Sequence, residues 1–221
     1  MNAIPHVNTV GVQRADHVYQ SLLSDIMSGH YRPGQQLVID DIAGGFGVSI
    51  TPVRDALTRL EGQGVVIRMP YTGSFVRSFD VREIEELYEV RAGLEVTAAG
   101  LAAVRINAEQ LDRLRSYQRD GEEARHADDL DRYQRSNLGF HATIFEAARN
   151  RLLVRTMESI KIQMQMMIAQ TIKVPGRPGR ASREHLELVE LLTAGDAHGA
   201  EVLMRAHVYS ALDDLRAKPP A

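Results

Sequence analysis

The residues best suited to chemistry are three histidines and one amide that face inward in the C-terminal half of the chain. Asn137 and His141 lie four residues apart on an otherwise apolar stripe of one predicted helix, and His185 and His207 face inward from two others. Neutral imidazoles suit zinc, nickel, copper or iron, and an amide oxygen adds a hard ligand. A single inward histidine is usually a hydrogen-bonded core residue. Two interpretations therefore stay open, separate core histidines or one metal site shared by three helices.

A second candidate is Arg91, which lies on the inner, apolar stripe of a helix predicted at 80–105. A buried guanidinium must find a partner. Glu95, four residues later on the same face, can supply one as an internal ion pair. The alternative is that Arg91 binds the carboxylate of a small molecule through two parallel hydrogen bonds. The spacing does not decide between the two.

The third candidate is the segment Val48–Leu60 near the N-terminus, whose polar residues could contact DNA. Ser49, Thr51 and Arg54 lie off the apolar stripe of this predicted helix. They are therefore free to face a groove or a phosphate, and the free N–H groups at the helix start are additional phosphate donors. A helix of this kind fits the major groove of DNA.

The elements that position this segment follow the order of a winged helix-turn-helix. Helices are predicted over Asp16–Met27, about Asp40–Phe46, and from a cap at Ser49 or Thr51 to Gly62, followed by strands over 65–68 and 74–77. Gly47 is a predicted C-terminal cap, and Pro52 stands in the first turn of the third helix. The order predicts a DNA-binding domain over 13–79 with a small β-hairpin wing.

The remainder of the chain has only helical patterns. Helices are predicted near 80–105, 108–126, 128–148, 151–172, 182–194 and 197–216, with a loop over 174–180. The fold class is therefore mainly α, with the winged helix-turn-helix followed by an antiparallel bundle of six helices, or seven, over 80–216. Tails are expected at 1–12 and 217–221.

Composition limits the classes of function. The net charge is −3 with neutral histidine, and residues 1–79 contain six Arg, no Lys and six Asp or Glu. DNA binding must therefore depend on individually placed arginines rather than on a basic domain. Cysteine is absent, which excludes disulfides and thiolate metal sites. The chain shows neither a membrane span nor a signal peptide, so we expect a cytoplasmic protein.

At the level of motifs, the N-terminal half resembles the GntR family of regulators. The segments that match are Gly47–Gly64, which looks like the family's recognition helix, and the flanking Tyr31–Leu37 and Gly73–Val76. The resemblance implies a homodimeric regulator that reads a short palindromic operator in double-stranded DNA. The residues expected at the DNA are Arg32, Ser49, Ile50, Thr51, Arg54, Arg59, Thr72 and Gly73.

This sequence departs from the family pattern at three places. Ile50 stands where the family usually has a DNA-contacting arginine, Gly44-Gly45 replaces a charged pair, and Thr72 replaces an arginine at the tip of the wing. Each loss removes phosphate charge or a guanine contact. The operator sequence is therefore not expected to follow the family norm.

The C-terminal half resembles the FadR C-terminal (FCD) effector domain. The matching residues are Tyr88–Glu95, Asn137–His141, Asn150, Glu184-His185, Gly195-Asp196 and His207. The resemblance implies a divalent metal held by Asn137, His141, His185 and His207, with zinc as the first choice and nickel, manganese or iron as alternatives. Asn137 replaces the common aspartate. A small organic acid would bind at the metal beside Arg91 and Glu95.

These features favour a ligand-responsive transcription regulator, a repressor of a catabolic operon. The first alternative is a regulator for which the metal ion itself is the signal. The remote alternative is a metal-dependent hydrolase. No glutamate is placed as an obvious general base, and the sequence has no phosphate loop, nucleophile elbow or HExxH motif. We therefore assign no catalytic residue and expect no enzyme.

Overall fold

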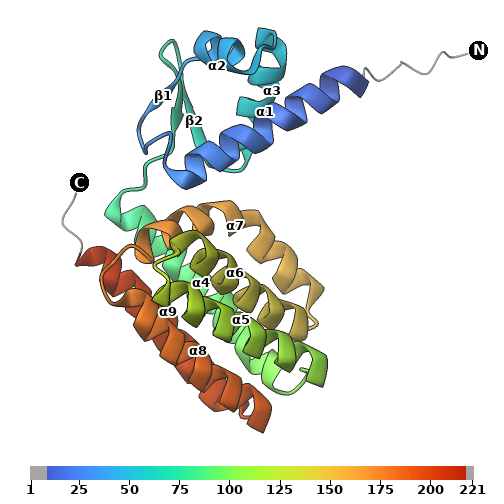
Figure 1. Ribbon diagram of the computed structural model, residues 1–221, viewed down its shortest axis with the longest axis vertical. Helices are drawn as coiled ribbons and strands as arrows, with labels where there is room; N and C mark the ends of the chain where they lie inside the picture. Colours follow the sequence, from blue (N-terminus) through green and yellow to red (C-terminus); the bar gives the residue numbers. More distant parts are fainter. Residues whose placement is uncertain (1–8, 218–221) are drawn as a thin grey trace, which may run out of the picture. The chain divides into compact units, whose positions relative to one another are not determined.

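The computed structural model describes residues 9–217 and divides them into two units, with the boundary between Ser78 and Phe79 (Figure 1). Most of the tails predicted at 1–12 and 217–221 lies outside the described residues. The predicted fold class is confirmed, since a winged helix-turn-helix unit is followed by an all-helical unit.

The N-terminal unit combines three helices with a small antiparallel sheet. Its elements are α1 (Thr9–Ser28), β1 (Gln36–Leu37), α2 (Ile39–Phe46), α3 (Ile50–Gly62), β2 (Val66–Met69) and β3 (Gly73–Val76), and the strand order is β1-β3-β2. Helix α1 packs mainly on α3, with Val18, Leu22, Val53 and Leu57 fully buried or nearly so. Burial of these side chains fixes which face of α3 is left for solvent.

Local signals explain most of these boundaries. Gly47 ends α2 in the left-handed conformation (φ 62°), which glycine adopts without a steric penalty. The extended Ser49 precedes α3, and Pro52 lies in its first turn, where a missing N–H costs nothing. The two-residue strand β1 was not predicted, because a segment this short has no periodicity of its own and forms only by pairing with β3.

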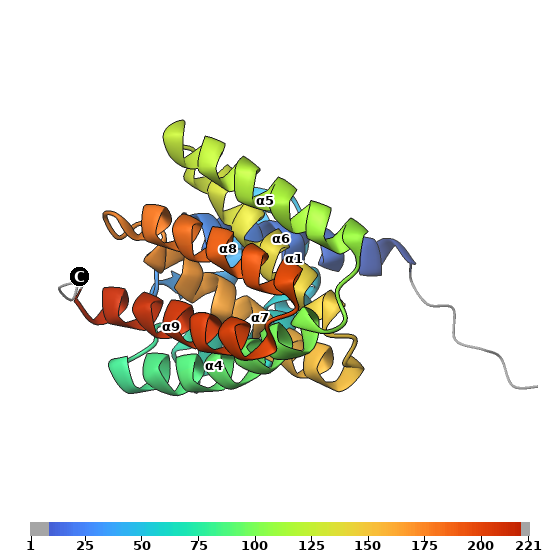
Figure 2. The same ribbon diagram turned by 90° about the horizontal axis from the view of Figure 1, so that it is seen from below.

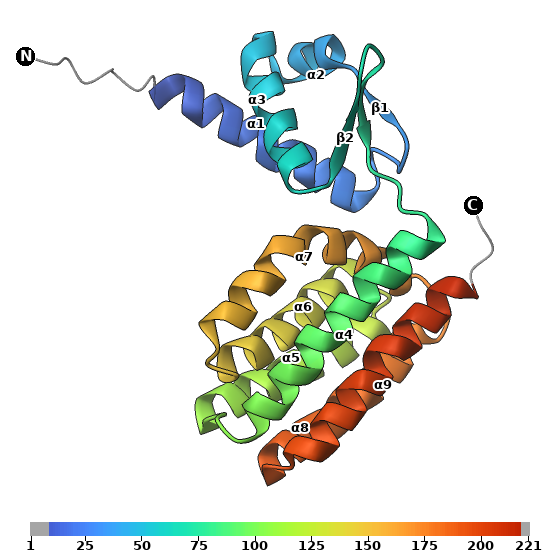
Figure 3. The same ribbon diagram turned by 180° about the vertical axis from the view of Figure 1, so that it is seen from behind.

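The C-terminal unit contains six helices among its described residues. They are α4 (Val81–Ala103), α5 (Ala108–His126), α6 (Leu130–Ala147), α7 (Arg151–Thr171), α8 (Arg177–Ala194) and α9 (Ala197–Arg216). Figures 2 and 3 show α9 alongside α4 and α5 alongside α6, which are also the two most extensive helix contacts. None of the described helices has the length and apolar character that a membrane span requires.

The boundaries confirm several caps and correct one loop. Asn107 and Gln110 form a capping box at the start of α5, and Asp196 caps α9. The loop predicted over 174–180 is wrong in its second half, because α8 begins at Arg177 after Gly176 in the left-handed conformation. Pro178 is typical of a helix breaker, but here it occupies the first turn, where proline is tolerated.

Gly139 allows α5 and α6 to approach each other closely, and its replacement gives a testable prediction for this unit. A Cβ atom at this position would overlap the ring of Tyr117. We expect Gly139→Ala to lower the free energy of unfolding by about 1–3 kcal/mol through overpacking. In contrast, Gly93→Ala on the open side of α4 has nothing within 4 Å and should raise it by about 0.5–1 kcal/mol. Urea unfolding measures the stability of both variants. Equal stability of Gly139→Ala and Gly93→Ala would contradict the close packing of α5 on α6 at Gly139.

Candidate metal centre and DNA-binding surface

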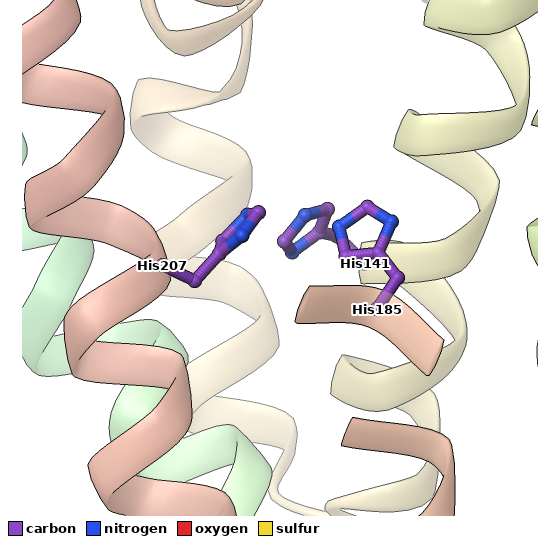
Figure 4. A group of neighbouring side chains, drawn as sticks. All are labelled: His141, His185 and His207. Carbon is purple, nitrogen blue, oxygen red and sulfur yellow. The ribbon is translucent and has the colours of Figure 1, made fainter. Parts of the chain in front are cut away.

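The structure brings together the three histidines that the sequence placed on separate helices. His141 on α6, His185 on α8 and His207 on α9 are all buried, and one ligand nitrogen from each lies within 4.8 Å of the others. The ring centroids are 4.9–5.2 Å apart, and Figure 4 shows the three rings converging on one point between the helices. This is the spacing that a single ion with several imidazole ligands would need.

The hydrogen bonding of this cluster is incomplete, and this observation tests whether a metal fits. Both ring nitrogens of His141, Nε2 of His185 and Oε2 of Glu95 are buried without a hydrogen-bond partner among the described residues. Buried polar atoms are almost always bonded. Unbonded ring nitrogens on neighbouring buried histidines are what a bound cation would satisfy, so the residues fit a metal.

The electrostatics of the cluster favour the neutral form of two of its rings, those of His185 and His207. Burial first, and then the neighbouring charges, including that of His141, lower the pKa of His185 and of His207 well below the ordinary value. A neutral imidazole is the form that binds a metal. His185 and His207 are therefore held in the protonation state that a metal ligand requires.

Two carboxylates lie directly behind the rings. Glu184 Oε2 is 2.6 Å from His207 Nδ1, a distance typical of a strong hydrogen bond. Glu95 Oε2 is 2.9 Å from His141 Nδ1, although the two groups are not aligned for a hydrogen bond. Carboxylates in this position commonly orient histidine ligands and leave the other nitrogen for the metal. The family resemblance implied a place for Glu95 at the effector, and no sequence pattern indicated such a role for Glu184.

Asn137 lies beside the cluster, one helical turn before His141 on α6. It is buried and lines one small void with His207 and another with His185. Its amide makes no hydrogen bond with any residue in the described part of the chain. The amide is thus available next to the three histidines, as the sequence analysis expected.

Arg91 has the internal partner that the sequence left open. Its Nε donates to Glu95 Oε1 at 2.7 Å, and the two side chains are only 3% and 5% exposed. Burial alone would raise the pKa of Glu95, but Arg91 and His141 together hold that pKa below its ordinary value. Arg91 also borders a void of about 20 Å³, which has room for little more than a water molecule.

A much larger cavity of about 1270 Å³ lies along α6 and α7 and reaches the cluster at Glu95 and His141. Apolar side chains such as Phe145, Met157 and Met164 line it. The two methionines belong to a stripe of apolar residues along α7, and the sequence pattern of that stripe is more typical of core or dimer contact. Four basic residues also line the cavity, namely Arg149, Arg151, Arg155 and Lys161. A carboxylate-bearing molecule could therefore reach the histidines from this side.

Arg177 is a buried residue at the site that the sequence analysis missed. Its guanidinium lies 3.2 Å from Glu184 Oε2 and donates to Ser210 Oγ at 2.7 Å and to the backbone oxygen of His207 at 3.2 Å. These contacts join the start of α8 to α9 next to the histidines. The signal that could have revealed Arg177 is Pro178, which is typical of a helix start as well as of a loop.

In the N-terminal unit, α3 exposes the residues expected at DNA. Ser49, Thr51 and Arg54 are exposed, and none of their side chains bonds to another residue among those whose side chains are described. Ser49 precedes α3 without making a side-chain capping bond, so its hydroxyl is free. The helix cap expected at Ser49 or Thr51 is therefore not formed by the side chain of Ser49.

The other residues expected at DNA lie at different places. Arg32, Thr72 and Gly73 are exposed, the last two at the turn of the β2–β3 wing. Arg59 forms an ion pair with Asp16 of α1, and its guanidinium carbon lies 4.0 Å from the centre of the Tyr19 ring. The guanidinium of Arg59 thus already has partners within the unit.

Comparison with known proteins finds two matching family models. Residues 14–76 match the model described as bacterial regulatory proteins, gntR family, and residues 86–210, more than half of the chain, match the FCD domain.

Curated relatives and solved structures show the same organisation. The chain is 28% identical over 190 residues to the Nta operon transcriptional regulator of Aminobacter aminovorans, covering 86% of this chain and 88% of that protein. It is 24% identical over 199 residues to the transcriptional repressor RspR of Escherichia coli, covering 90% and 87%. A GntR-type regulator from Rhodococcus sp. RHA1 has the same fold, with a TM-score of 0.79 at 23% identity over 94% of this chain and all (100%) of that one.

Proposed function

The chain belongs to the GntR family of bacterial regulatory proteins and has an FCD domain in its C-terminal half, and we propose that it is a metal-containing, ligand-responsive repressor. The observation on which the proposal rests is the buried three-histidine cluster with unbonded nitrogens. That cluster lies in the same chain as a winged helix-turn-helix with exposed polar residues on α3. Regulators with this domain pair have one unit for DNA and one for a signal.

The ion would be held by His141, His185 and His207, with the amide of Asn137 beside them. Zinc is the first choice, because three imidazoles and an open position suit it. When bound, the metal would act as a Lewis acid that accepts a carboxylate oxygen. Two carboxylates of the chain would hold the site in its arrangement, because Glu184 orients the ring of His207 and Glu95 neutralises the buried charge of Arg91.

The signal in this proposal is a small organic acid. Its body would lie in the cavity along α6 and α7, with its carboxylate at the histidines. Arg91 would then affect the site mainly through its ion pair with Glu95, rather than by binding the acid itself. The effector must favour one conformation of the dimer over the other to change DNA affinity. Release from a palindromic operator is proposed because a relative, RspR, is named a repressor. The chain would act in the cytoplasm, where operator DNA lies.

One observation favours a second candidate, in which the metal ion alone is the signal. The guanidinium of Arg91 is already bonded to Glu95, so it is not a free anion-binding group at the cluster. In that case operator affinity would follow metal occupancy without any organic ligand.

An operator-binding assay distinguishes the two candidates. The full chain would be stripped of metal, reloaded with zinc, and then mixed with a panel of carboxylic acids, while binding to DNA from upstream of its gene is followed by fluorescence anisotropy. The first candidate predicts that at least one acid weakens binding of the zinc form about tenfold or more. If zinc alone changes affinity and no acid adds to it, the metal-sensing candidate holds. If the chain binds no specific DNA in any form, both are contradicted.

The role of Asn137 gives a further prediction. Asn137→Asp would place a carboxylate beside the three imidazoles and should tighten zinc binding about tenfold or more, because the negative ligand neutralises part of the ion's charge. A competition titration against a chelator would measure this. Gln134→Glu adds the same charge one turn earlier on α6 and serves as the control. Equal effects of both substitutions would contradict the placement of Asn137 at the metal.

A further inference from the structure

Ile50 is an exposed apolar residue in an otherwise polar surface. It is the first residue of α3, and it is 41% exposed between the exposed Ser49 and Thr51. The core-facing side of α3 is formed by Val53 and Leu57, which are fully buried or nearly so. Ile50 therefore lies outside the buried core of the unit, with about two fifths of its surface open to solvent at the start of the helix.

The chemistry of this side chain restricts what it can recognise. The side chain of isoleucine has no donor, acceptor or charge, so this side chain can bind neither a phosphate nor the polar edge of a guanine. In the major groove the one apolar feature that distinguishes a base pair is the C5-methyl group of thymine. The polar side-chain contacts at this helix start must come from the free hydroxyls of Ser49 and Thr51 and from Arg54.

The charge of the unit makes such a contact significant. Residues 1–79 contain six Arg, no Lys and six Asp or Glu, so unspecific attraction to phosphates is small. A larger share of the discrimination between sequences then depends on contacts with the bases themselves. An apolar contact of one side chain becomes a measurable part of that discrimination.

We propose that Ile50 contacts the 5-methyl group of a thymine in each half of the operator and thereby selects an A·T pair at that position. The inference rests on the proposed DNA-binding function and adds to it the identity of one base and of the atom that is read.

The experiment starts from a random-sequence library of duplexes, from which the full chain selects those that it binds. Each thymine of the enriched duplex would then be replaced by deoxyuridine, which lacks only the methyl group. We expect one thymine in each half-site at which the replacement lowers the affinity of the unmodified protein about fourfold, and about fifteenfold when both are replaced. Ile50→Ala should bind the two kinds of duplex equally.

A matched control is Val38→Ala, which removes another exposed apolar side chain of the same unit (42% exposed) outside α3. This variant should keep the full sensitivity to the methyl group. The inference is overturned if no deoxyuridine replacement affects the unmodified protein, or if Ile50→Ala remains as sensitive as the unmodified protein. If the library yields no enriched duplex at all, the proposed DNA binding fails and the inference fails with it.

Discussion

Replacing His207 with alanine is expected to lower the affinity of the protein for zinc by more than about 100-fold. Loss of a residue that merely supports a ligand typically costs 10–100-fold, and loss of a ligand should cost more. The fold should tolerate the change, because Glu184, which accepts from His207, keeps its contact with Arg177 at 3.2 Å. The variant should also lose the stabilisation that zinc confers, about 2.7 kcal/mol when zinc is present at 100 times its Kd.

His198→Ala provides the matched control for this result. His198 lies on the same helix, α9, but is exposed and outside the cluster. Isothermal titration with zinc should give one site per chain in this variant, as in the unmodified protein. The metal centre would be contradicted if both variants bound zinc with equal affinity. Unfolding of each protein in the presence of a chelator separates loss of metal from loss of fold, because it measures the cost of the cavity left by His207→Ala when no metal is bound.

The second large effect is expected at Arg54, which is exposed on α3 and has no side-chain partner among the residues whose side chains are described. Arg54→Ala should lower the affinity for the selected duplex about 10- to 100-fold, since the proposed dimer would lose the contact in both half-sites. The dependence of affinity on salt should also become shallower, because fewer counterions are released on binding. Fluorescence anisotropy at several salt concentrations measures both quantities.

Arg59→Ala is the informative comparison, because Arg59 lies on the same helix but is paired with Asp16 and packed on Tyr19. An exposed ion pair and a cation–π contact each contribute about 1 kcal/mol or less to stability. We therefore expect Arg59→Ala to lower the free energy of unfolding slightly and to leave the salt dependence of DNA binding almost unchanged. A loss of affinity equal to that of Arg54→Ala would show that Arg59 is also at the DNA.

The sequence allowed prediction of those parts of the fold and the site that depend on local periodicity. The inward faces of three helices follow from apolar spacing, so the spacing predicts that the histidines on α6, α8 and α9 face the core, but it left open whether they meet at one site. Caps such as Gly47 and Asp196 were also predictable from local sequence, because each satisfies backbone groups of its own helix.

The remaining features depend on contacts between segments far apart in the chain. The pairing of Glu184 with His207 and the position of Arg177 require the packing of α8 on α9, which no short pattern encodes. The strand β1 forms only against β3, and the cavity along α6 and α7 depends on how these two helices pack. Whether Arg91 pairs with Glu95 or stays free likewise required the tertiary structure.

The most direct test of the metal centre is anomalous diffraction at the zinc absorption edge from crystals of the full chain grown with zinc. The expected result is one strong peak per chain at about 2.0–2.1 Å from a ring nitrogen of each of His141, His185 and His207. A map without a peak inside the bundle, or with zinc only on surface residues such as His198, would contradict the metal centre on which the proposed regulation depends.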